Sequence, residues 1–337
     1  MSTLSDVASA AGVSPTTISR YIGNRIVLPQ ATRDRIDAAI AALDYRPNLL
    51  AKRLSTGRAE AIGLVTPEID NPFFAQLAAA VEAEAERHGY AVYMSSTHGD
   101  PTREIGAVRR MRDGHVDGLV LITSRPDDGS LARLLADDDK VVLLDEDVPG
   151  VGLCRVFVQN EHGAQMATQH LIAAGHRHIA FIGGPPGLMS VQERRIGFTR
   201  AMAEAKLPIA AEDVFLQDYS RAFGNQAAQA IIALKRRPSA IFASSDYLAI
   251  GVLSALQQAG LSVPDDMSLV GFDDMPFAEL VNPPLTTIRQ PVPQMGRIAF
   301  QLLLALMNGE DAAPITRLPV ELVQRKSVLR HPDRSFI

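Results

Sequence analysis

Hydrophobic and polar positions change their spacing near residue 58 of the chain. Before that point, apolar residues recur every three to four positions over the segments 4–11, 15–22 and 30–43, which is typical of amphipathic helices. After it, apolar runs such as AIGLVT, KVVLLD and HIAFIGG alternate with helical stretches. Short apolar strands separated by helices predict parallel sheets that are covered on both faces. About ten such strands are more than a single open sheet usually contains, so we expect two lobes, each with its own sheet.

Proline-bearing stretches at 45–57, around Gln159 and at 282–293 are typical of connections between these parts. A last helix near 295–307 indicates that the chain returns to the first lobe near its end. The predicted fold class is an all-α helix-turn-helix head plus an α/β body of two doubly wound parallel-sheet lobes. We expect the head over 1–45, a hinge helix and linker over 46–60, the N-terminal lobe over 61–160 plus 291–320, and the C-terminal lobe over 161–290 plus 321–330.

The head carries the local signals of a helix-turn-helix. Gly12 and Val13 form the turn between the first two helices. Ser14 is a favourable N-cap and Pro15 a favourable first residue for the second helix. The small Ala8 suits a position where two helices cross closely. We therefore expect the second helix to begin at Pro15 and to pack against the first.

The exposed face of that second helix is a candidate for reading DNA. It carries Thr16, Thr17 and Arg20, and side chains near the N-terminus of such a helix can reach base edges in the major groove. Arg20 could read guanine or hold a phosphate, whereas Ser14 and Thr17 are better placed for phosphates. A helical hairpin that only packs is the alternative.

The charge of the chain is divided unevenly. Its 337 residues have a formal net charge of −5, yet residues 1–58 carry eight basic and four acidic side chains, and the remainder carries 25 basic and 34 acidic ones. A basic head on an acidic body is typical of local contact with phosphates, although a solvated face is the alternative. No apolar run reaches the ~18–20 residues of a membrane span, and the start does not resemble a signal peptide. With one cysteine, Cys154, we expect a cytoplasmic protein without disulfides or cofactors.

The segment between head and body is a candidate hinge helix. It is shorter than the ~12–15 residues that an isolated helix needs in water. Its leucines, among them Leu54, have no domain of their own to enter, and burying a leucine is worth roughly 1.5–3 kcal/mol. Two copies could pair, with Leu54 wedged into a minor-groove step and Lys52 and Arg53 on phosphates. Asn48 in the same segment is a further candidate for DNA contact, and a flexible linker is the alternative.

Polar side chains gather beyond the carboxyl ends of the predicted strands, where open α/β sheets bind ligands. Carboxylates and amides accept or donate hydroxyl protons, and aromatic rings cover a C–H face, so the set suits a polyhydroxylated ligand. An arginine near a helix start is poorly placed for the helix dipole, which favours a hydroxylated or anionic partner for it. The candidate ligand-binding residues are Asn71, Phe73, Phe74, Asp145, Glu146, Ser190, Arg194, Tyr219, Ser245, Asp273 and Gln290. The phenylalanines could instead be core residues, and Asp273 could be a turn former.

Several catalytic and metal motifs are absent from the sequence. The GGPPG run at 183–187 lacks the Gly-Lys-Ser/Thr ending of a nucleotide-binding loop. His170, His176 and His178 lack the spacing of a closed metal site and have no cysteine partners. No Gly-x-Ser-x-Gly elbow of a hydrolase occurs. We expect neither an enzyme nor a metal site.

Several sequence motifs, in the same order along the chain, resemble those of the LacI/GalR family of bacterial regulators, and the resemblance covers essentially the full length. The segments that carry the likeness are TLSDVASAAGVSPTTISR (3–20), YRPNLLAKRLSTGR (45–58), IGLVTPEIDNPFF (62–74), GHRHIAFIGG (175–184), ERRIGF (193–198), VGFDD (270–274) and PPLTTIRQP (283–291). The resemblance implies a transcription regulator, a repressor by expectation, that binds a near-palindromic operator as a homodimer or tetramer. Its body would look like a periplasmic sugar-binding protein, with a small-molecule effector between the lobes.

The resemblance also implies roles for single residues. Pro15, Thr16 and Arg20 match positions that read bases, Leu54 resembles the intercalating leucine and Ala51 its minor-groove neighbour. The positions that match ligand contacts of the family are Phe73, Phe74, Asp145, Arg194, Tyr219, Asp273 and Gln290.

Two positions depart from the ribose-type pattern of the family. Glu146 stands where those relatives often carry arginine, and Ser245 replaces a frequent asparagine. We therefore expect a sugar or sugar derivative as the effector but not ribose itself. A purine, a sugar acid and a metabolite phosphate are the alternatives. A sugar-binding module without DNA function, or a sugar-modifying enzyme of related fold, would be the alternatives for the protein as a whole.

Overall fold

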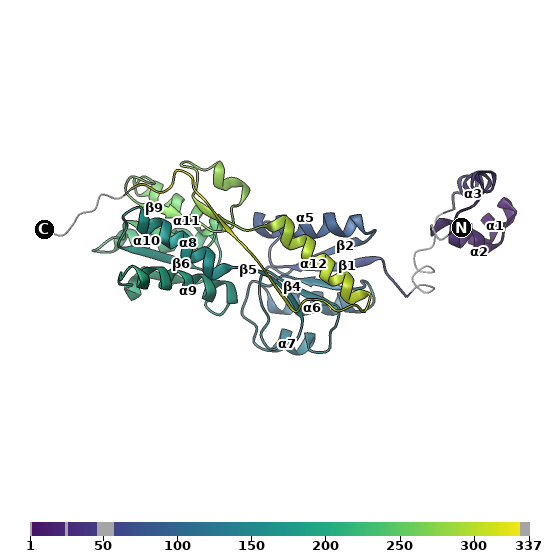
Figure 1. Cartoon of the computed structure of the whole chain (residues 1–337), viewed down its shortest axis with the longest axis horizontal. Helices are drawn as coiled ribbons and strands as arrows, with labels where there is room; N and C mark the ends of the chain where they lie inside the picture. The colour runs from purple at the N-terminus through teal and green to yellow at the C-terminus, as the bar shows by residue number, and fades with distance from the viewer. Residues whose placement is uncertain (1, 24–25, 46–56, 331–337) are drawn as a thin grey trace. The chain divides into compact units, whose positions relative to one another are not determined.

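The computed structural model describes residues 2–23, 26–45 and 57–330, which divide into two units, Met1–Ala59 and Glu60–Ile337 (Figure 1). We call the first unit the head and the second the body. Residues 46–56 of the predicted hinge segment, with Asn48, Ala51, Lys52 and Leu54, lie outside the described residues.

The head consists of the helices α1 (Leu4–Ala11), α2 (Pro15–Ile22) and α3 (Gln30–Ala42). The side chain of Thr3 accepts a hydrogen bond from the backbone N–H of Asp6, and the carboxylate of Asp6 accepts one from the backbone of Thr3, so a capping box begins α1. Gly12 ends α1 in the left-handed conformation, with φ at 65°. The predicted bounds of α1 and α2 are confirmed, because the signals that set them are local.

The head closes around a small apolar core. Val7, Ala8 and Ala11 of α1 meet Ile18 of α2 and Ile36 of α3, all of them buried. Ala39 and Tyr45 complete this core, and Ile40 and Leu43 are only partly buried against it. The hydroxyl group of Tyr21 donates to the carboxylate of Asp37 at 3.0 Å and so ties α2 to α3.

In the described part of the body, the first lobe is built on a six-stranded parallel sheet in the order β11-β5-β4-β3-β1-β2. Its strands are β1 (Ala61–Thr66), β2 (Ala91–Ser96), β3 (Leu119–Leu121), β4 (Val141–Leu144), β5 (Cys154–Val158) and β11 (Ile315–Leu318). Helices α5 (Pro72–Arg87) and α12 (Val292–Met307) cover one face of the sheet, and α6 (Pro101–Arg112) and α7 (Ser130–Leu135) cover the other (Figure 1). Both faces are therefore buried, as the unbroken apolar runs predict.

In the second lobe, the described residues form a four-stranded parallel sheet in the order β7-β6-β8-β9. Its strands are β6 (Ile179–Gly183), β7 (Val214–Leu216), β8 (Ala240–Ala243) and β9 (Ser268–Val270). Helices α8 (Asn160–Ala173) and α9 (Met189–Glu204) pack on one face, and α10 (Arg221–Ala233) and α11 (Asp246–Gln258) pack on the other. Short 3-10 helices η1 (Ala211–Asp213) and η2 (Pro276–Glu279) and an antiparallel pair, β10 (Thr287–Arg289) with β12 (Glu321–Val323), complete the lobe.

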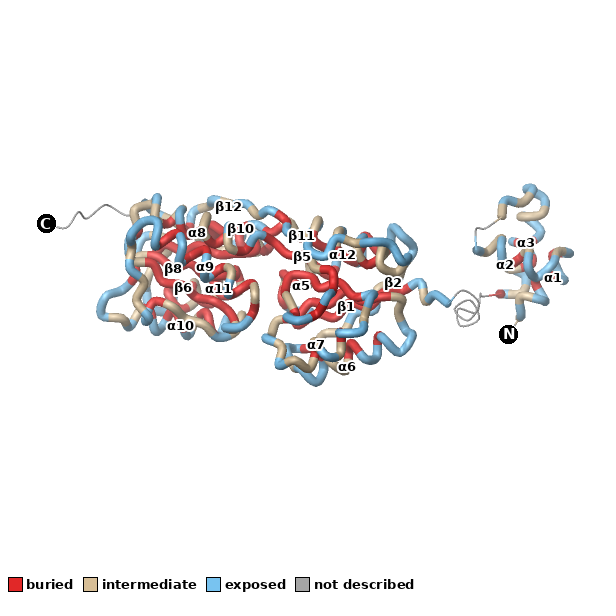
Figure 2. Tube along the Cα trace, turned by 60° about the horizontal axis from the view of Figure 1, so that its bottom comes forward, coloured by how far each residue is buried: buried red, intermediate tan, exposed pale blue. Residues whose placement is uncertain are grey.

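The chain passes between the lobes after β5, after β10 and after β11. As predicted, it returns to the first lobe near its end, where α12 packs on α5 and β11 pairs with β5. Figure 2 shows the central strands of the body as buried and the outer sides of the covering helices as largely exposed, whereas the edge strands β2 and β11 are partly exposed. The predicted fold class, a helical head plus a body of two parallel-sheet lobes, is confirmed. No helix within the described residues has the length and apolar character needed to cross a membrane.

Candidate functional site

The candidate DNA-reading residues lie together at the start of α2. Ser14, Pro15, Thr16 and Arg20 are exposed, and Thr17 is half-buried. The Ser14 hydroxyl oxygen accepts a hydrogen bond from the backbone N–H of Thr17 at 3.1 Å, and the two hydroxyl groups lie 2.8 Å apart. The cap thus fixes the first turn of α2 and leaves the side chains of Thr16 and Arg20 on its exposed face.

A buried carboxylate joins the two lobes. Glu146, directly beyond β4 of the first lobe, is 2% exposed. Its Oε1 accepts a hydrogen bond from the backbone N–H of Met189 at 2.7 Å, and its Oε2 accepts one from the Ser190 hydroxyl group at 2.6 Å. The backbone N–H of Ser190 adds a longer contact at 3.3 Å. Glu146 therefore supplies the negative charge that the N-terminus of α9 attracts.

Arg194 lies one turn further along α9, and its contacts come from its own lobe. Its Nε donates to Oδ1 of Asn160 at 2.8 Å, and its Nη1 donates to the carbonyl oxygen of Ser244 at 2.6 Å. The guanidinium group lies 3.8 Å from the centre of the Phe272 ring and forms an ion pair with Asp273 at 3.7 Å. These contacts hold a buried cation in one orientation.

Asp273 is the centre of a second set of contacts. Its Oδ2 accepts a hydrogen bond from Ser245 at 3.0 Å, and its Oδ1 accepts one from the side-chain amide of Gln290 at 2.8 Å. Behind it, the buried Asp246 accepts hydrogen bonds from the backbone N–H of Met275 at 2.8 Å and from the Thr287 hydroxyl group at 2.6 Å. Segments far apart in the sequence therefore meet at this point.

Some buried polar atoms of this cluster have no hydrogen-bond partner among the described residues. They are Oδ1 of Asp145, Oε1 of Gln290 and the hydroxyl group of Tyr219, which lies beside Ser190. Each such atom is costly in a protein interior, typically by about 1–3 kcal/mol, and a ligand that donates hydrogen bonds would remove this cost. Asp145 and Asp273 also have positive φ angles, 72° and 115°, which are rare for residues other than glycine and concentrate at functional sites.

Burial changes the acidity of this cluster. It raises the pKa of Asp145 to about 7, although the nearby Arg194 opposes the change. It also raises the pKa of Asp273 to about 6, against the opposing effects of Arg194 and of the hydrogen bonds from Gln290 and Ser245. The pKa of Glu146 is raised by burial too, and its hydrogen bonds with Ser190 limit the rise. The cluster is therefore not fully ionised near neutral pH.

We call the set Asp145, Glu146, Ser190, Arg194, Tyr219, Ser245, Asp273 and Gln290 the interlobe cluster. The other three candidate ligand residues, Asn71, Phe73 and Phe74, have contacts of a different kind. Asn71 is the N-cap of α5 and accepts a hydrogen bond from the backbone N–H of Phe73 at 3.1 Å. Phe73 and Phe74 pack edge to face, with ring centres 5.5 Å apart, in the core of the first lobe. That core also includes Met275 of the second lobe, so the rings lie where the lobes touch.

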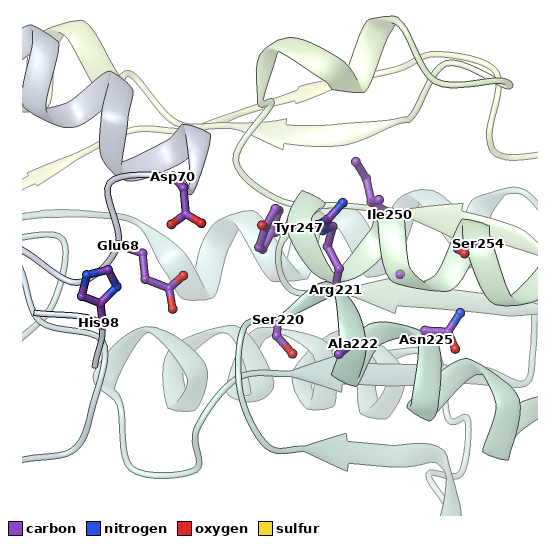
Figure 3. A pocket seen from close by; sticks show the side chains of 11 residues that line it. Glu68, Asp70, His98, Ser220, Arg221, Ala222, Asn225, Tyr247, Ile250 and Ser254 are labelled. Atoms are coloured by element: carbon purple, nitrogen blue, oxygen red, sulfur yellow. The ribbon is translucent and has the colours of Figure 1, made fainter. Parts of the chain in front are cut away.

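A separate open cavity of about 580 Å³ lies between the lobes (Figure 3). Glu68, Asp70 and His98 come to it from the first lobe, and Arg221 and Tyr247 from the second, with the guanidinium group 5.6 Å from the Tyr247 ring. None of the residues of the interlobe cluster is among those that line the cavity. It is therefore a second polar region between the lobes.

Sequence reasoning missed several residues that build the interlobe cluster. Asn160 begins α8 two positions beyond β5, so the rule that ligand residues follow parallel strands could have found it. Phe272 likewise lies two positions beyond β9, but its contact with the distant Arg194 is not visible in the sequence. Gly184, in the GGPPG run, gives room to the ring of Tyr219, which a Cβ at that position would overlap.

The described residues contain no group of histidine, cysteine and acidic side chains that could hold a metal ion. His178 instead shares a hydrogen bond with the carboxylate of Asp213 at 2.9 Å. A helix-turn-helix head together with a two-lobed body that holds a buried polar cluster defines a DNA-binding regulator with a ligand-sensing domain.

Comparisons with known proteins agree with this class. Residues 3–48 match the family described as bacterial regulatory proteins, lacI family, and residues 168–328 match a periplasmic binding protein-like domain. The HTH-type transcriptional repressor PurR of Aliivibrio fischeri (strain MJ11) is 33% identical over 333 residues, which cover 98% of this chain and 99% of that protein. The PurR of Vibrio parahaemolyticus serotype O3:K6 (strain RIMD 2210633) is 34% identical and covers 97% of this chain and 99% of its own length.

Solved structures give the same result. The Lac repressor dimer bound to operator and the anti-inducer ONPF has a TM-score of 0.85 and 29% identity, and covers 97% of this chain and 99% of that chain. The transcriptional regulator CelR–cellobiose complex has a TM-score of 0.74 and 30% identity, and covers 97% of this chain and 100% of that chain. The chain therefore belongs to the LacI family of bacterial regulatory proteins. It is a DNA-binding transcriptional repressor with an effector-binding body and not an enzyme, as the sequence predicts.

Proposed function

We propose that the effector is a sugar or sugar derivative that binds at the interlobe cluster and changes the affinity of the repressor for its operator. The observation that carries the proposal is the pair of buried acceptors without partners, Oδ1 of Asp145 and Oε1 of Gln290, beside the fixed guanidinium group of Arg194. Ligand hydroxyl groups would satisfy these acceptors. A relative of the same fold is known as a complex with cellobiose, which supports a sugar here. A purine base is the alternative effector, because the sequence analysis gives a purine as an alternative and the relatives above carry the name PurR.

The contacts between the lobes indicate how effector binding could change the affinity of the head for DNA. Glu146 holds the N-terminus of α9, and Arg317 of β11 forms a double hydrogen bond with Glu193 of α9, at 2.7 and 2.9 Å. A ligand that contacts both lobes would favour one relative position of the lobes over another. In a dimer, this movement would change the spacing of the two hinge helices and thereby operator affinity. Coupling energies of this kind are typically about 1–3 kcal/mol.

We propose further that the repressor acts in the cytoplasm and binds a near-palindromic operator as a homodimer, with a tetramer as the alternative state. The DNA contacts would come from Ser14, Pro15, Thr16, Thr17 and Arg20 of the head and from Asn48, Ala51, Lys52 and Leu54 of the segment 46–60. The N-terminal lobe would comprise 61–160 plus 291–320, and the C-terminal lobe 161–290 plus 321–330.

The DNA part of the proposal is tested with a duplex that the full chain selects from a random pool. Arg20→Ala should weaken binding of that duplex about 5- to 150-fold, the range of one good contact to a base pair. Arg35→Ala, an exposed arginine on α3, removes the same charge outside the proposed contact face and is the matched control. Equal losses in the two variants would show that α2 provides only charge. Leu54→Ala should weaken operator binding much more than effector binding.

The effector part is tested by a thermal-shift screen over sugars, sugar derivatives and purine bases, followed by operator binding with each hit. A ligand at about 100 times its dissociation constant stabilises a protein by about 2.7 kcal/mol, which such a screen detects. Asp273→Ala should abolish the ligand effect while operator binding without ligand stays intact. Asp265→Ala, an exposed aspartate at the edge of the second lobe, is the control. A full ligand response in Asp273→Ala would place the effector elsewhere, with the cavity of Figure 3 as the next site to test.

A further inference from the structure

The interlobe cluster contains more acidic than basic groups. Asp145, Glu146 and Asp273 are each more than nine-tenths buried, and the buried Asp246 lies directly behind Asp273. Arg194 is the only lysine or arginine that is buried among the described residues. Burial keeps part of these groups protonated near neutral pH, and a negatively charged ligand would be repelled by the carboxylates that remain ionised in this region of low dielectric.

The place where an anion would ordinarily bind is already taken by Glu146. The N-terminus of a helix attracts anions because its first backbone N–H groups have no partners within the helix. At α9 these groups belong to Met189 and Ser190, and both donate to the carboxylate of Glu146, as does the Ser190 hydroxyl group. A carboxylate of the first lobe thus occupies the anion-binding position at the N-terminus of α9 in the second lobe.

The one buried guanidinium group is also engaged. Arg194 is held by Asn160, by the carbonyl oxygen of Ser244 and by the Phe272 ring, and its charge is paired with Asp273 at 3.7 Å. An arginine binds carboxylates and phosphates best through two parallel hydrogen bonds. An anionic ligand would have to compete with Asp273 for the positive charge of this side chain.

The atoms that lack partners require hydrogen-bond donors from a ligand. Oδ1 of Asp145 and Oε1 of Gln290 are acceptors, whereas the hydroxyl group of Tyr219 can donate or accept. Ligand O–H and N–H groups would satisfy all three. A carboxylate or phosphate of a ligand carries acceptors only and would satisfy Tyr219 alone.

We propose that Glu146 makes the interlobe cluster selective for uncharged ligands rich in hydrogen-bond donors and excludes sugar acids and phosphorylated metabolites. This inference rests on the proposed function for the statement that an effector binds here. The selectivity against anions, which we call the charge rule, rests on the contacts of Glu146 and can be tested without an effector.

The first experiment uses inorganic sulfate as the probe and the full chain as the protein. Glu146→Ala exposes the backbone N–H groups of Met189 and Ser190, so sulfate should bind this variant at least about tenfold more tightly than the unchanged protein. The measurement is the thermal midpoint of the body against sulfate concentration, with sodium chloride at equal ionic strength as the reference. Glu310→Ala, an exposed glutamate after α12, should respond like the unchanged protein. Equal sulfate responses in Glu146→Ala and Glu310→Ala overturn the proposal.

Should Glu146→Ala fail to fold, Glu146→Gln serves as the second variant, because it keeps the size of the side chain and removes only its charge. We expect Glu146→Gln to bind sulfate more tightly than the unchanged protein, but with a smaller gain in affinity than Glu146→Ala. An unchanged affinity in a folded Glu146→Gln protein counts against the proposal.

The second experiment compares matched compounds: glucose with glucuronate and glucose 6-phosphate, ribose with ribose 5-phosphate, and guanine with guanosine monophosphate. For any set that contains a ligand, the neutral member should bind at least about tenfold more tightly, and Glu146→Gln should reduce that ratio. Tighter binding of an anionic member refutes the charge rule. If no member changes operator affinity, the proposed function fails for these compounds, while the sulfate measurement still decides the role of Glu146.

Discussion

The buried carboxyl group of Asp145 should make the stability of the body depend on pH. Its pKa is about 7 in the folded protein because of burial, against an ordinary value of 3.8. The folded state therefore binds this proton more tightly than the unfolded state does. The resulting stabilisation is fully present below about pH 4 and is lost as the pH rises through about 7.

The size of the effect follows from these two values. A difference from 3.8 to about 7, at about 1.36 kcal/mol for each pH unit, corresponds to an upper limit of about 4 kcal/mol in the free energy of unfolding. Asp273, with its pKa raised to about 6, contributes in the same direction at lower pH. Asp145→Asn removes the first contribution and changes little else. Asparagine has the same size, and it tolerates the positive φ of 72° at this position.

The assay is thermal unfolding of the full chain from pH 4 to pH 8 at constant ionic strength and without effector. At pH 4 the unchanged protein and Asp145→Asn should unfold at similar temperatures, because the stabilisation by the proton on Asp145 is still almost fully present there. At pH 8 the variant should unfold at a higher temperature, by up to about 10 °C. Asp265→Asn changes an exposed aspartate and should follow the unchanged protein at every pH. Parallel curves for Asp145→Asn and the unchanged protein would refute the assignment of the titrating group.

Three further predictions concern stability. Thr3→Ala removes the capping box of α1 and should cost the head about 1 kcal/mol, read as a lower unfolding midpoint in circular dichroism that Thr3→Ser restores. Gly197→Ala should destabilise the body by about 1–3 kcal/mol in denaturant unfolding, because the added methyl group would overlap the backbone of α8. In the control Gly106→Ala of α6, the added Cβ would lie 3.3 Å from only the flexible end of the Arg110 side chain, so this variant should stabilise the body by up to about 1 kcal/mol. Equal effects of Gly197→Ala and Gly106→Ala would contradict the observed packing of α9 on α8. Thr287→Val should cost about 1–3 kcal/mol, because the buried Asp246 loses a hydrogen bond of 2.6 Å, and Thr287→Ser should recover most of it.

Sequence reasoning succeeded where the determining contacts are local. The start of α2 follows from Ser14 and Pro15, which act within one turn of helix. Strand β1 was predicted with its observed bounds because its apolar run is unbroken and fully buried. The candidate residues beyond β4 and in α9 were chosen from the position of strand ends, and the structure brings them into contact; that they bind a ligand stays a prediction.

It failed where a residue depends on partners far away in the chain. Strand β11 has an exposed, polar sequence, and only its pairing with β5, more than a hundred residues earlier, makes it a strand. Phe73 and Phe74 look the same in sequence whether they face a ligand or the core; the fold packs them in a core cluster, and their contact with a ligand stays a prediction. The cavity with Glu68, His98 and Arg221 draws on three separate segments, so no single stretch signals it.

The return of α12 and β11 to the first lobe has a consequence for the synthesis of the protein. The sheet that begins with β1 cannot bury its face against α12 until residue 307 has left the ribosome, although β5 is complete at residue 158. At about 5–20 residues per second, the nascent first lobe waits on the order of 10 s with this apolar face only partly covered, by α5. The head needs only the first 45 residues for its core and can fold long before. A chain that stops before residue 292 would therefore present a complete DNA-reading tip on a body whose first lobe lacks its last helix, a fragment suited to chaperone capture and proteolysis.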